Sequence, residues 1–175
     1  VMSKAIPVWI KNTFAPADEG TLIEAVPHTN GNIVRGISSI NNIALISLEG
    51  SGMIGIPGFS KRLFEALSSE KINVILITQS SSEHSICVAI NEDDAGKAKN
   101  IIDSTFAFEI ATEKVEPLVV ENNLAIIALV GDNMKSHPGI SGKMFGVMGR
   151  NGVNIRAIAQ GSSERNISAV ISAGD

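Results

Sequence analysis

Residues 41–90 read NNIALISLEGSGMIGIPGFSKRLFEALSSEKINVILITQSSSEHSICVAI, and residues 122–171 read NNLAIIALVGDNMKSHPGISGKMFGVMGRNGVNIRAIAQGSSERNISAVI. The two stretches align from Asn41 and Asn122 onward without a gap, so that Gly50 matches Gly131 and Gln79 matches Gln160. Self-similarity at one fixed offset indicates repeated structural units. The sequence therefore predicts two copies of one unit.

The first copy has the element order of a β-α-β-β-α-β unit. Residues 43–48 form a nearly continuous apolar run, which is typical of a buried strand. A loop with Gly and Pro at residues 50–58 leads into a helix whose apolar face carries Phe59, Leu63 and Leu67. We expect further strands at residues 74–77, 85–90 and 118–120, and a second helix that opens with the acids at 92–94. This order is the ferredoxin-like split βαβ fold, of the α+β class.

The second copy stops after its third strand, because the counterpart of the second helix would begin at residue 175. A unit that lacks its last strand leaves a sheet edge uncovered, and proteins normally cover such edges. The strand-like sequence IVRGISSI at residues 33–40 can fill this place. We therefore expect the first unit (41–120) to be inserted within the second (33–40 with 121–175), whereas residues 1–32 form no third copy.

Composition and charge narrow the class of protein. The chain has 175 residues, of which 44% are hydrophobic and 18% charged, so it has ample material for a packed core. Its formal net charge of −4 argues against a nucleic-acid partner. A single cysteine, Cys87, fits a reducing compartment, and the longest apolar run, Leu124–Val130, is too short to span a membrane. We expect a cytoplasmic piece of a larger protein, with no membrane segment.

Most catalytic interpretations are weak. Gly50–Gly55 reads GSGMIG, a dinucleotide-binding pattern, but Pro57 and Gly58 follow it, no acid ends the next strand, and the repeat keeps only the first glycine. The histidines and Cys87 share no metal-ligand spacing. We expect no catalytic residue and no metal site in this chain, although nucleotide binding at Gly50–Gly55 stays open as a rival hypothesis.

A small-ligand site is a better hypothesis. The loop from Met53 to Phe59 leads into a helix N-terminus, where backbone N–H groups favour a carboxylate. The next strand is flanked by Asn73 and Gln79, whose amides can hold an ammonium, a carboxylate or a hydroxyl. These groups suit an amino acid. The alternative is that Asn73 and Gln79 serve only turns and strand ends.

Four segments carry a family resemblance: ITQSSSEHSI at residues 77–86, AIAQGSSERNIS at 157–168, IPVWIKNTF at 6–14 and GTLI at 20–23. At these segments the chain resembles the regulatory region of aspartokinases, a pair of ACT domains, and most nearly that of the bifunctional aspartokinase–homoserine dehydrogenases. Residues 1–32 are then similar to the end of a kinase domain and its linker.

The resemblance implies an allosteric region that binds an end-product amino acid and relays inhibition to the kinase. It also implies a homodimer or higher homo-oligomer formed through ACT–ACT pairing, and a parent enzyme that uses ATP with Mg and NADP, with no cofactor in this chain. Lysine-sensitive relatives carry an aspartate at the position of Ile75, and the second copy has Arg156 there. An apolar group would leave a lysine ammonium unpaired, so L-threonine is the expected ligand.

The loop chemistry and the resemblance together predict a set of ligand-binding residues in the first copy and a smaller set in the second. In the first copy they are Met53, Gly55, Ile56, Pro57, Gly58, Phe59, Asn73, Val74, Ile75, Ile77, Gln79, Ser82 and Glu83; in the second they are Asn154, Ile155, Ile158 and Gln160. The principal alternative function is a dimerisation module that responds to no ligand.

Overall fold

The computed structural model describes residues 2–24, 33–79, 84–131, 134–161 and 165–175. The chain divides into two compact units, Val1–Asn32 and Ile33–Asp175. In the smaller unit, a short helical turn, η1 (Met2–Lys4), precedes the strands β1 (Val8–Ile10) and β2 (Thr21–Ile23). These two strands pair antiparallel, with Trp9 opposite Leu22.

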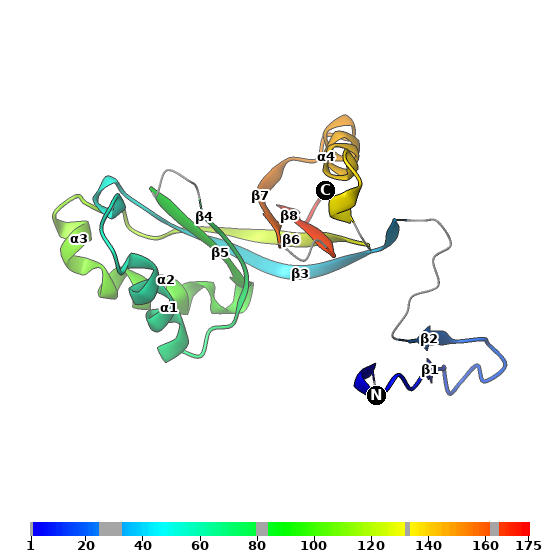
Figure 1. Ribbon diagram of the computed structural model, residues 1–175. Coiled ribbons are helices and arrows are strands. Elements are labelled where there is room, and N and C mark those ends of the chain that lie inside the picture. Colours follow the sequence, from blue (N-terminus) through cyan, green and yellow to red (C-terminus); the bar gives the residue numbers. More distant parts are fainter. Residues whose placement is uncertain (1, 25–32, 80–83, 132–133, 162–164) are drawn as a thin grey trace. The chain divides into compact units, whose positions relative to one another are not determined.

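The larger unit is built on one six-stranded antiparallel sheet with the order β4-β5-β3-β6-β8-β7 (Figure 1). Its strands are β3 (Val34–Glu49), β4 (Val74–Gln79), β5 (Ser85–Asn91), β6 (Val119–Gly131), β7 (Ile155–Gln160) and β8 (Asn166–Ser172). Its helices are α1 (Phe59–Ser69), α2 (Ala95–Thr105), α3 (Ala107–Ala111) and α4 (Ile140–Arg150), with short helical turns η2 (Ser51–Met53), η3 (Glu92–Asp94) and η4 (Met134–Ser136).

The strand order confirms that the first ferredoxin-like unit is inserted within the second. The C-terminal half of β3 lies between β5 and β6, because Ile46 is opposite both Val88 and Val120. The N-terminal half of β3 pairs instead with the second unit's part of β6, where Ile37 is opposite Leu129. Residues 34–40 therefore take the place of the fourth strand of the second unit.

We expected the strands of the two units to be separate where one unit passes into the other, and this expectation was wrong. Residues 33–40 and 43–48 belong largely to the single strand β3, and residues 118–120 and 124–130 largely to the single strand β6. The two junctions fall at Asn42 and Asn123, which have φ angles of 58° and 59° and occupy the same position in the two repeats. Asparagine adopts this left-handed conformation more readily than most residues, so each strand can bend without ending.

Two layers of apolar side chains hold the larger unit together. The first layer lies between the β3–β5 half of the sheet and the helices α1 and α2, and includes Leu63, Val88 and Ile102, none of which has measurable exposure. The second layer fills the inside of the curled sheet, whose edge strands β4 and β7 lie against each other (Figure 1). It draws on both repeats, through Leu45 and Leu76 of the first and Ile126 and Val170 of the second.

Helix α3 follows α2 almost without a break and was not predicted from the sequence. It begins after Phe106, a fully buried residue of the first core, and Ile110 packs partly against the same core. Among the residues that the structure describes, no helix is long and apolar enough to cross a lipid bilayer.

Candidate functional site: a pocket at the N-terminus of α1

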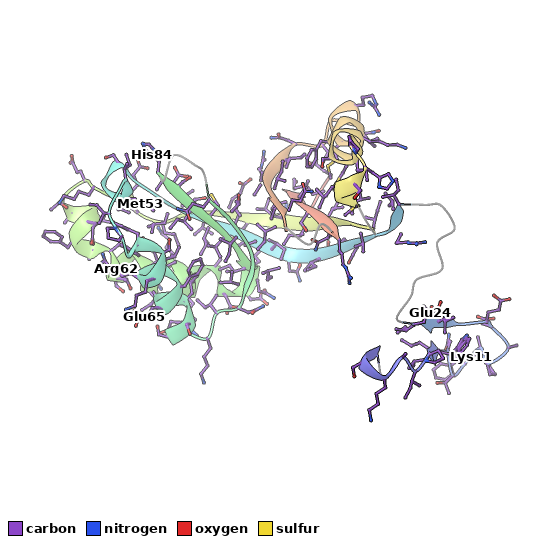
Figure 2. The ribbon with its side chains drawn as sticks, viewed as in Figure 1. Lys11, Glu24, Met53, Arg62, Glu65 and His84 are labelled. Atoms are coloured by element: carbon purple, nitrogen blue, oxygen red, sulfur yellow. The ribbon has the colours of Figure 1, made fainter. Side chains whose placement is uncertain are left out.

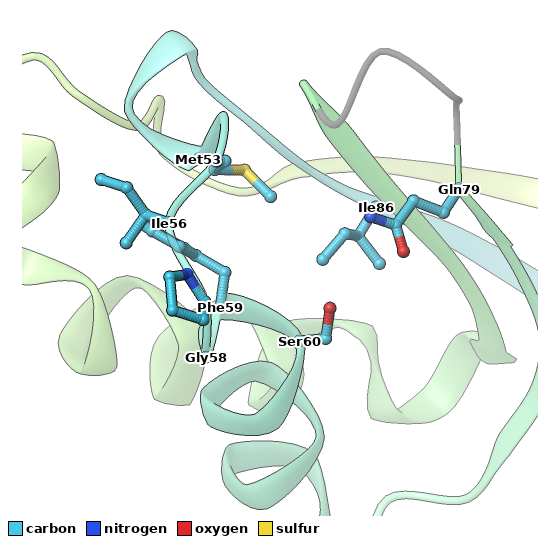
Figure 3. A pocket seen from close by; sticks show the side chains of 9 residues that line it. Met53, Ile56, Gly58, Phe59, Ser60, Gln79 and Ile86 are labelled. Atoms are coloured by element: carbon cyan, nitrogen blue, oxygen red, sulfur yellow. The ribbon is translucent and has the colours of Figure 1, made fainter.

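The first ferredoxin-like unit contains a pocket of about 330 Å³ between the start of α1 and the adjoining ends of β4 and β5 (Figure 3). This volume is at the small end of the range of roughly 300–1,000 Å³ found for ligand sites. Its nine lining residues are Met53, Gly55, Ile56, Pro57, Gly58, Phe59, Ser60, Gln79 and Ile86. All nine are uncharged, so the pocket suits a small ligand whose charges can be met by backbone groups.

The loop before α1 is held in place by a close approach of two backbones. The N–H of Gly52 donates to the carbonyl of Lys114 at 2.9 Å. A Cβ atom at Gly50 would lie only 2.3 Å from that same carbonyl oxygen, so a side chain there would displace the backbone. These glycines therefore bring η2, and with it Met53, against the segment that leads into β6.

The N-terminus of α1 faces this pocket without a side-chain cap. Gly58 precedes the helix with φ at 102°, and its carbonyl accepts the first helical hydrogen bond, from the N–H of Arg62 at 3.0 Å. The first N–H groups of a helix have no partner within the helix. Those of Phe59 and Ser60 are therefore suited to a carboxylate, which the helix dipole also favours.

Two neutral polar side chains complete the pocket. Gln79 ends β4 and is opposite Ile86 of β5, so both side chains lie on the helix-covered face of the sheet. Figure 3 shows the Gln79 carboxamide beside Ile86, and the Ser60 hydroxyl pointing from α1 toward the same region. A carboxamide and a hydroxyl can each donate and accept, so they can satisfy an ammonium or a hydroxyl of a ligand.

Behind the pocket, Arg62 of α1 forms an ion pair with Glu109 of α3. The hydrogen bond from the guanidinium lowers the pKa of the Glu109 carboxyl, and the same hydrogen bond raises the pKa of Arg62. Both groups therefore stay charged at neutral pH. The pair does not line the pocket, but the guanidinium of Arg62 lies 5.8 Å from the ring centre of Phe59, which does.

The structure brings seven of the thirteen predicted first-copy residues to this pocket, namely Met53, Gly55, Ile56, Pro57, Gly58, Phe59 and Gln79. Four others, Asn73, Val74, Ile75 and Ile77, do not line it: Asn73 precedes β4, at the end opposite Gln79. Ile75 lies at a bulge in β4 and packs against the second core. Ser82 and Glu83 are outside the described residues.

Sequence reasoning missed two lining residues, Ser60 and Ile86. Ser60 is the second residue of α1, and its place in the first helical turn was a usable signal. Ile86 could have been found only from the register of β4 and β5, since it is opposite Gln79. No property of Ile86 alone distinguishes it from the other apolar residues of that strand.

The second unit repeats this loop geometry with other side chains. Gly139 precedes α4 with φ at 92°, and the N–H of His137 donates to the carbonyl of Met134 at 3.1 Å, as Ile56 does to Met53 in the first unit. The predicted residues Asn154, Ile158 and Gln160 are exposed, and Ile155 is half-buried. Arg156, the counterpart of Ile75, is paired with Glu121 at 2.6 Å.

The Gly50–Gly55 pattern does not open a helix, since α1 begins only at Phe59, as expected from Pro57 and Gly58. Cys87 packs against the second core, and its Sγ atom is 3.1 Å from the Ser47 hydroxyl. Among the described residues, no three His, Cys, Asp or Glu side chains cluster as a metal site would require.

Comparison with known proteins identifies this arrangement. The family model described as the ACT domain matches residues 46–106 and 127–175, one stretch in each repeat, and the chain therefore belongs to the ACT domain family. Its similarity to the bifunctional aspartokinase/homoserine dehydrogenase of Haemophilus influenzae is 41% identity over 171 residues. That match covers 98% of this chain and 21% of the relative, so the chain spans about a fifth of the relative's length.

Solved structures agree with this assignment. The regulatory subunit of aspartate kinase from Thermus thermophilus superposes with a TM-score of 0.69 at 26% identity, over 82% of this chain and 90% of that one. Aspartokinase III of E. coli in complex with lysine and aspartate has a TM-score of 0.75 at 26% identity, over 99% of this chain and 37% of that one. The resemblance to aspartokinase regulatory regions seen in the sequence is confirmed.

Proposed function

We propose that this chain is the effector-sensing regulatory region of an aspartokinase that also carries homoserine dehydrogenase activity, and that its first ACT unit binds L-threonine. The observation that carries the proposal is the pocket at the N-terminus of α1, where an uncapped helix end, a carboxamide and a hydroxyl line a small space with no charged side chain. The parent enzyme would use ATP with Mg for the kinase and NADP for the dehydrogenase, both bound outside this chain.

The ligand's groups are assigned from the pocket's chemistry. The carboxylate lies at the first N–H groups of α1, and the hydroxyl and ammonium lie near Gln79, Ser60 and backbone carbonyls of the loop. The methyl group contacts Met53 and Ile86, which are 4% and 2% exposed.

L-Lysine fits this pocket less well. Its side-chain ammonium would find no carboxylate among the nine lining residues, and a charge that leaves water without gaining a partner loses free energy. The neighbouring fold of aspartokinase III is described in complex with lysine, so effector choice in such proteins depends on the residues at the site and not on the fold. This preference now rests on the lining residues, because Ile75 does not reach the pocket.

Relay to the kinase is proposed to run along β3. This strand is continuous from Val34, just after the connection to residues 1–32, to Glu49, which is next to η2 of the pocket loop. A ligand that binds one conformation of this loop more tightly than another by roughly 1–3 kcal/mol would shift the conformational equilibrium enough to regulate the kinase.

Calorimetric titration of this chain tests the binding proposal. L-Threonine should bind, L-lysine should give no heat, and Gln79→Ala should weaken threonine binding about three- to tenfold, the effect of losing one or two hydrogen bonds. Gln160→Ala makes the same change in the second unit and serves as the matched control. Equal weakening by Gln160→Ala, or tighter binding of lysine, would contradict the assignment.

The alternative of a ligand-independent dimerisation module is favoured by one feature. Ile77 is 49% exposed on the edge strand β4, and Ile158 is 43% exposed at the equivalent place on β7. Edge strands with apolar side chains invite pairing with another chain. Analytical ultracentrifugation with and without threonine distinguishes threonine sensing from ligand-independent dimerisation. A dimer whose stability is the same with and without threonine, in a chain that binds no amino acid, supports the dimerisation module.

A further inference from the structure

Phe59 is both a wall of the pocket and the first residue of α1. It is 8% exposed, and its ring stacks on that of Phe106, with the ring centroids 5.6 Å apart and the planes 7° from parallel. Phe106 itself is fully buried at the junction between α2 and α3. The position of this pocket wall is therefore set by a residue that the ligand would not touch.

Arg62 holds the stacked rings together from outside the pocket lining. It follows Phe59 by one turn of α1, and Figure 2 shows it on the helical layer of the first unit, in the same half as Met53. Its guanidinium carbon lies 4.4 Å from the centre of the Phe106 ring and 5.8 Å from that of Phe59. Both distances are within the range of cation–π attraction.

The same guanidinium is tied to the α2–α3 junction by hydrogen bonds. One terminal nitrogen donates to the Glu109 carboxylate, and the other donates to the second oxygen of that carboxylate at 3.2 Å and to the Thr105 carbonyl at 2.7 Å. A planar fork that bonds a carboxylate at two points while its carbon lies over an aromatic ring is a geometry that lysine cannot reproduce.

The second unit lacks this arrangement at the corresponding positions. Ile140 stands in place of Phe59, and Lys143 stands in place of Arg62, so neither the aromatic wall nor the forked donor is repeated. Lys143 is exposed. The feature is therefore specific to the unit that contains the described pocket.

We propose that Arg62 is a positioning residue for this ligand site: by clamping Phe59 between the pocket and Phe106, it prepares the pocket wall before the ligand arrives. The inference rests on the proposed function for the identity of the ligand, L-threonine. Without the clamp, Phe59 samples other positions and must be ordered on binding. That cost corresponds to about a three- to tenfold loss of affinity, as for one immobilised side chain.

The test measures affinity and stability together in the 175-residue chain. Arg62→Met should weaken threonine binding about three- to tenfold. The affinity of Arg62→Lys should lie between those of Arg62→Met and the unsubstituted chain, since lysine keeps the charge but loses the forked donor. Lys61→Met removes the same charge from the neighbouring exposed position and should leave affinity unchanged. Leu118→Val trims a buried residue of the same core that does not line the pocket, so it should lower the melting temperature and leave affinity unchanged.

Ring resonances of ¹³C-labelled phenylalanine provide a readout without ligand. In the parent and in Lys61→Met, the stacked Phe59 and Phe106 should show distinct, ring-current-shifted signals, which should average in Arg62→Met. Unchanged affinity and unchanged ring signals in Arg62→Met would overturn the positioning role. If the unsubstituted 175-residue chain binds no amino acid, the proposed function fails. The ring signals alone then still decide whether Arg62 positions Phe59, the pocket wall.

Discussion

The helices α1 and α4 occupy the same place in two copies of one repeat, yet they are buried very differently. Helix α1 buries Phe59, Leu63, Ala66 and Leu67, whereas no residue of α4, all of which the structure describes, is buried. Within residues 33–175, the same unit of sequence therefore gives a firmly packed helix in the first repeat and a half-covered helix in the second.

The difference comes from the neighbours of each helix. In the first unit α2 and α3 extend the helical layer, and Val115 and Leu118, in the segment that leads into β6, are 2% and 3% exposed in the same core. The residues at the equivalent positions of the other repeat, Val34 and Ile37, are 39% and 72% exposed. The counterpart of α2 in the second repeat would begin only at about residue 175, and among the described residues no helix covers α4 as α2 covers α1.

Helix composition adds to this contrast. Gly142, Gly146 and Gly149 fall within α4, at positions where α1 has Lys61, Glu65 and Ser68. Each glycine in a helix interior costs roughly 0.5–1 kcal/mol relative to alanine. Helix α4 therefore has both a lower intrinsic stability and less tertiary packing, and the unit with the stronger helix is the one whose N-terminus forms the described pocket.

The largest expected effect separates the two helices directly. Leu63→Ala removes a fully buried side chain and should lower the free energy of unfolding by about 2–5 kcal/mol. Met144→Ala makes the equivalent change in α4, where the side chain is half-buried, and should cost at most about 1 kcal/mol. Urea unfolding of both variants gives the values. Equal losses would show that the second unit is packed as tightly as the first.

A smaller effect is expected where each helix ends. Lys71 and Gly152 occupy equivalent positions in the two repeats and have φ angles of 57° and 76°, the left-handed conformation that glycine adopts without strain. Gly152→Ala should therefore cost about 1 kcal/mol or slightly more, and Lys71→Gly should change stability by less than about 0.5 kcal/mol, because relieved strain offsets lost chain stiffness. Thermal unfolding measures both. A large loss in Lys71→Gly would contradict the equivalence of the two helix ends.

The smallest effect concerns the Arg62–Glu109 pair of the first unit. Because hydrogen bonding to Arg62 lowers the pKa of Glu109, the pair stabilises the fold fully above the ordinary glutamate pKa of about 4.3. That contribution is lost as the pH falls through the lowered folded-state pKa. With Arg62 39% exposed, we expect at most about 1 kcal/mol.

The unfolding free energies of the unsubstituted chain and of Glu109→Gln should therefore differ by a constant amount between about pH 8 and about pH 5. In more acidic solution the two free energies should converge. Denaturant titrations across this range provide the measurement. A difference that grows as the pH falls would mean that the carboxyl's pKa is raised, the opposite of the present assignment.

The repeat made much of this fold predictable. The constant offset between the two copies, the helix start after Pro57 and Gly58, and the insertion of one unit in the other all follow from local chemistry and matching residues. The fusion of neighbouring strands did not follow, because Asn42 and Asn123 are equally suited to a turn and to a bend within a strand. Pairing with strands that are distant in sequence decides between them.

The candidate site shows the same division. The loop from Met53 to Phe59 and the residue Gln79, which line the described pocket, could be proposed from residue type and position together with the family resemblance, since helix N-termini and strand ends have recognisable sequence signals. Asn73 has an equally suitable amide but lies at the other end of β4, and one strand's length separates it from Gln79. Residue type alone therefore does not show how far apart two side chains lie in the folded chain.

Local sequence was thus sufficient for the repeat, for the positions of α1, α2 and β5, and for the helix end that forms the pocket, because each depends on residues close together in the chain. Tertiary structure alone decided that Ile86 lines the pocket, that Ile75 turns to the second core, and that Phe106 supports Phe59. Each of these contacts joins elements from different parts of the chain, and strand register and helix packing, which place them, are properties of the folded molecule as a whole.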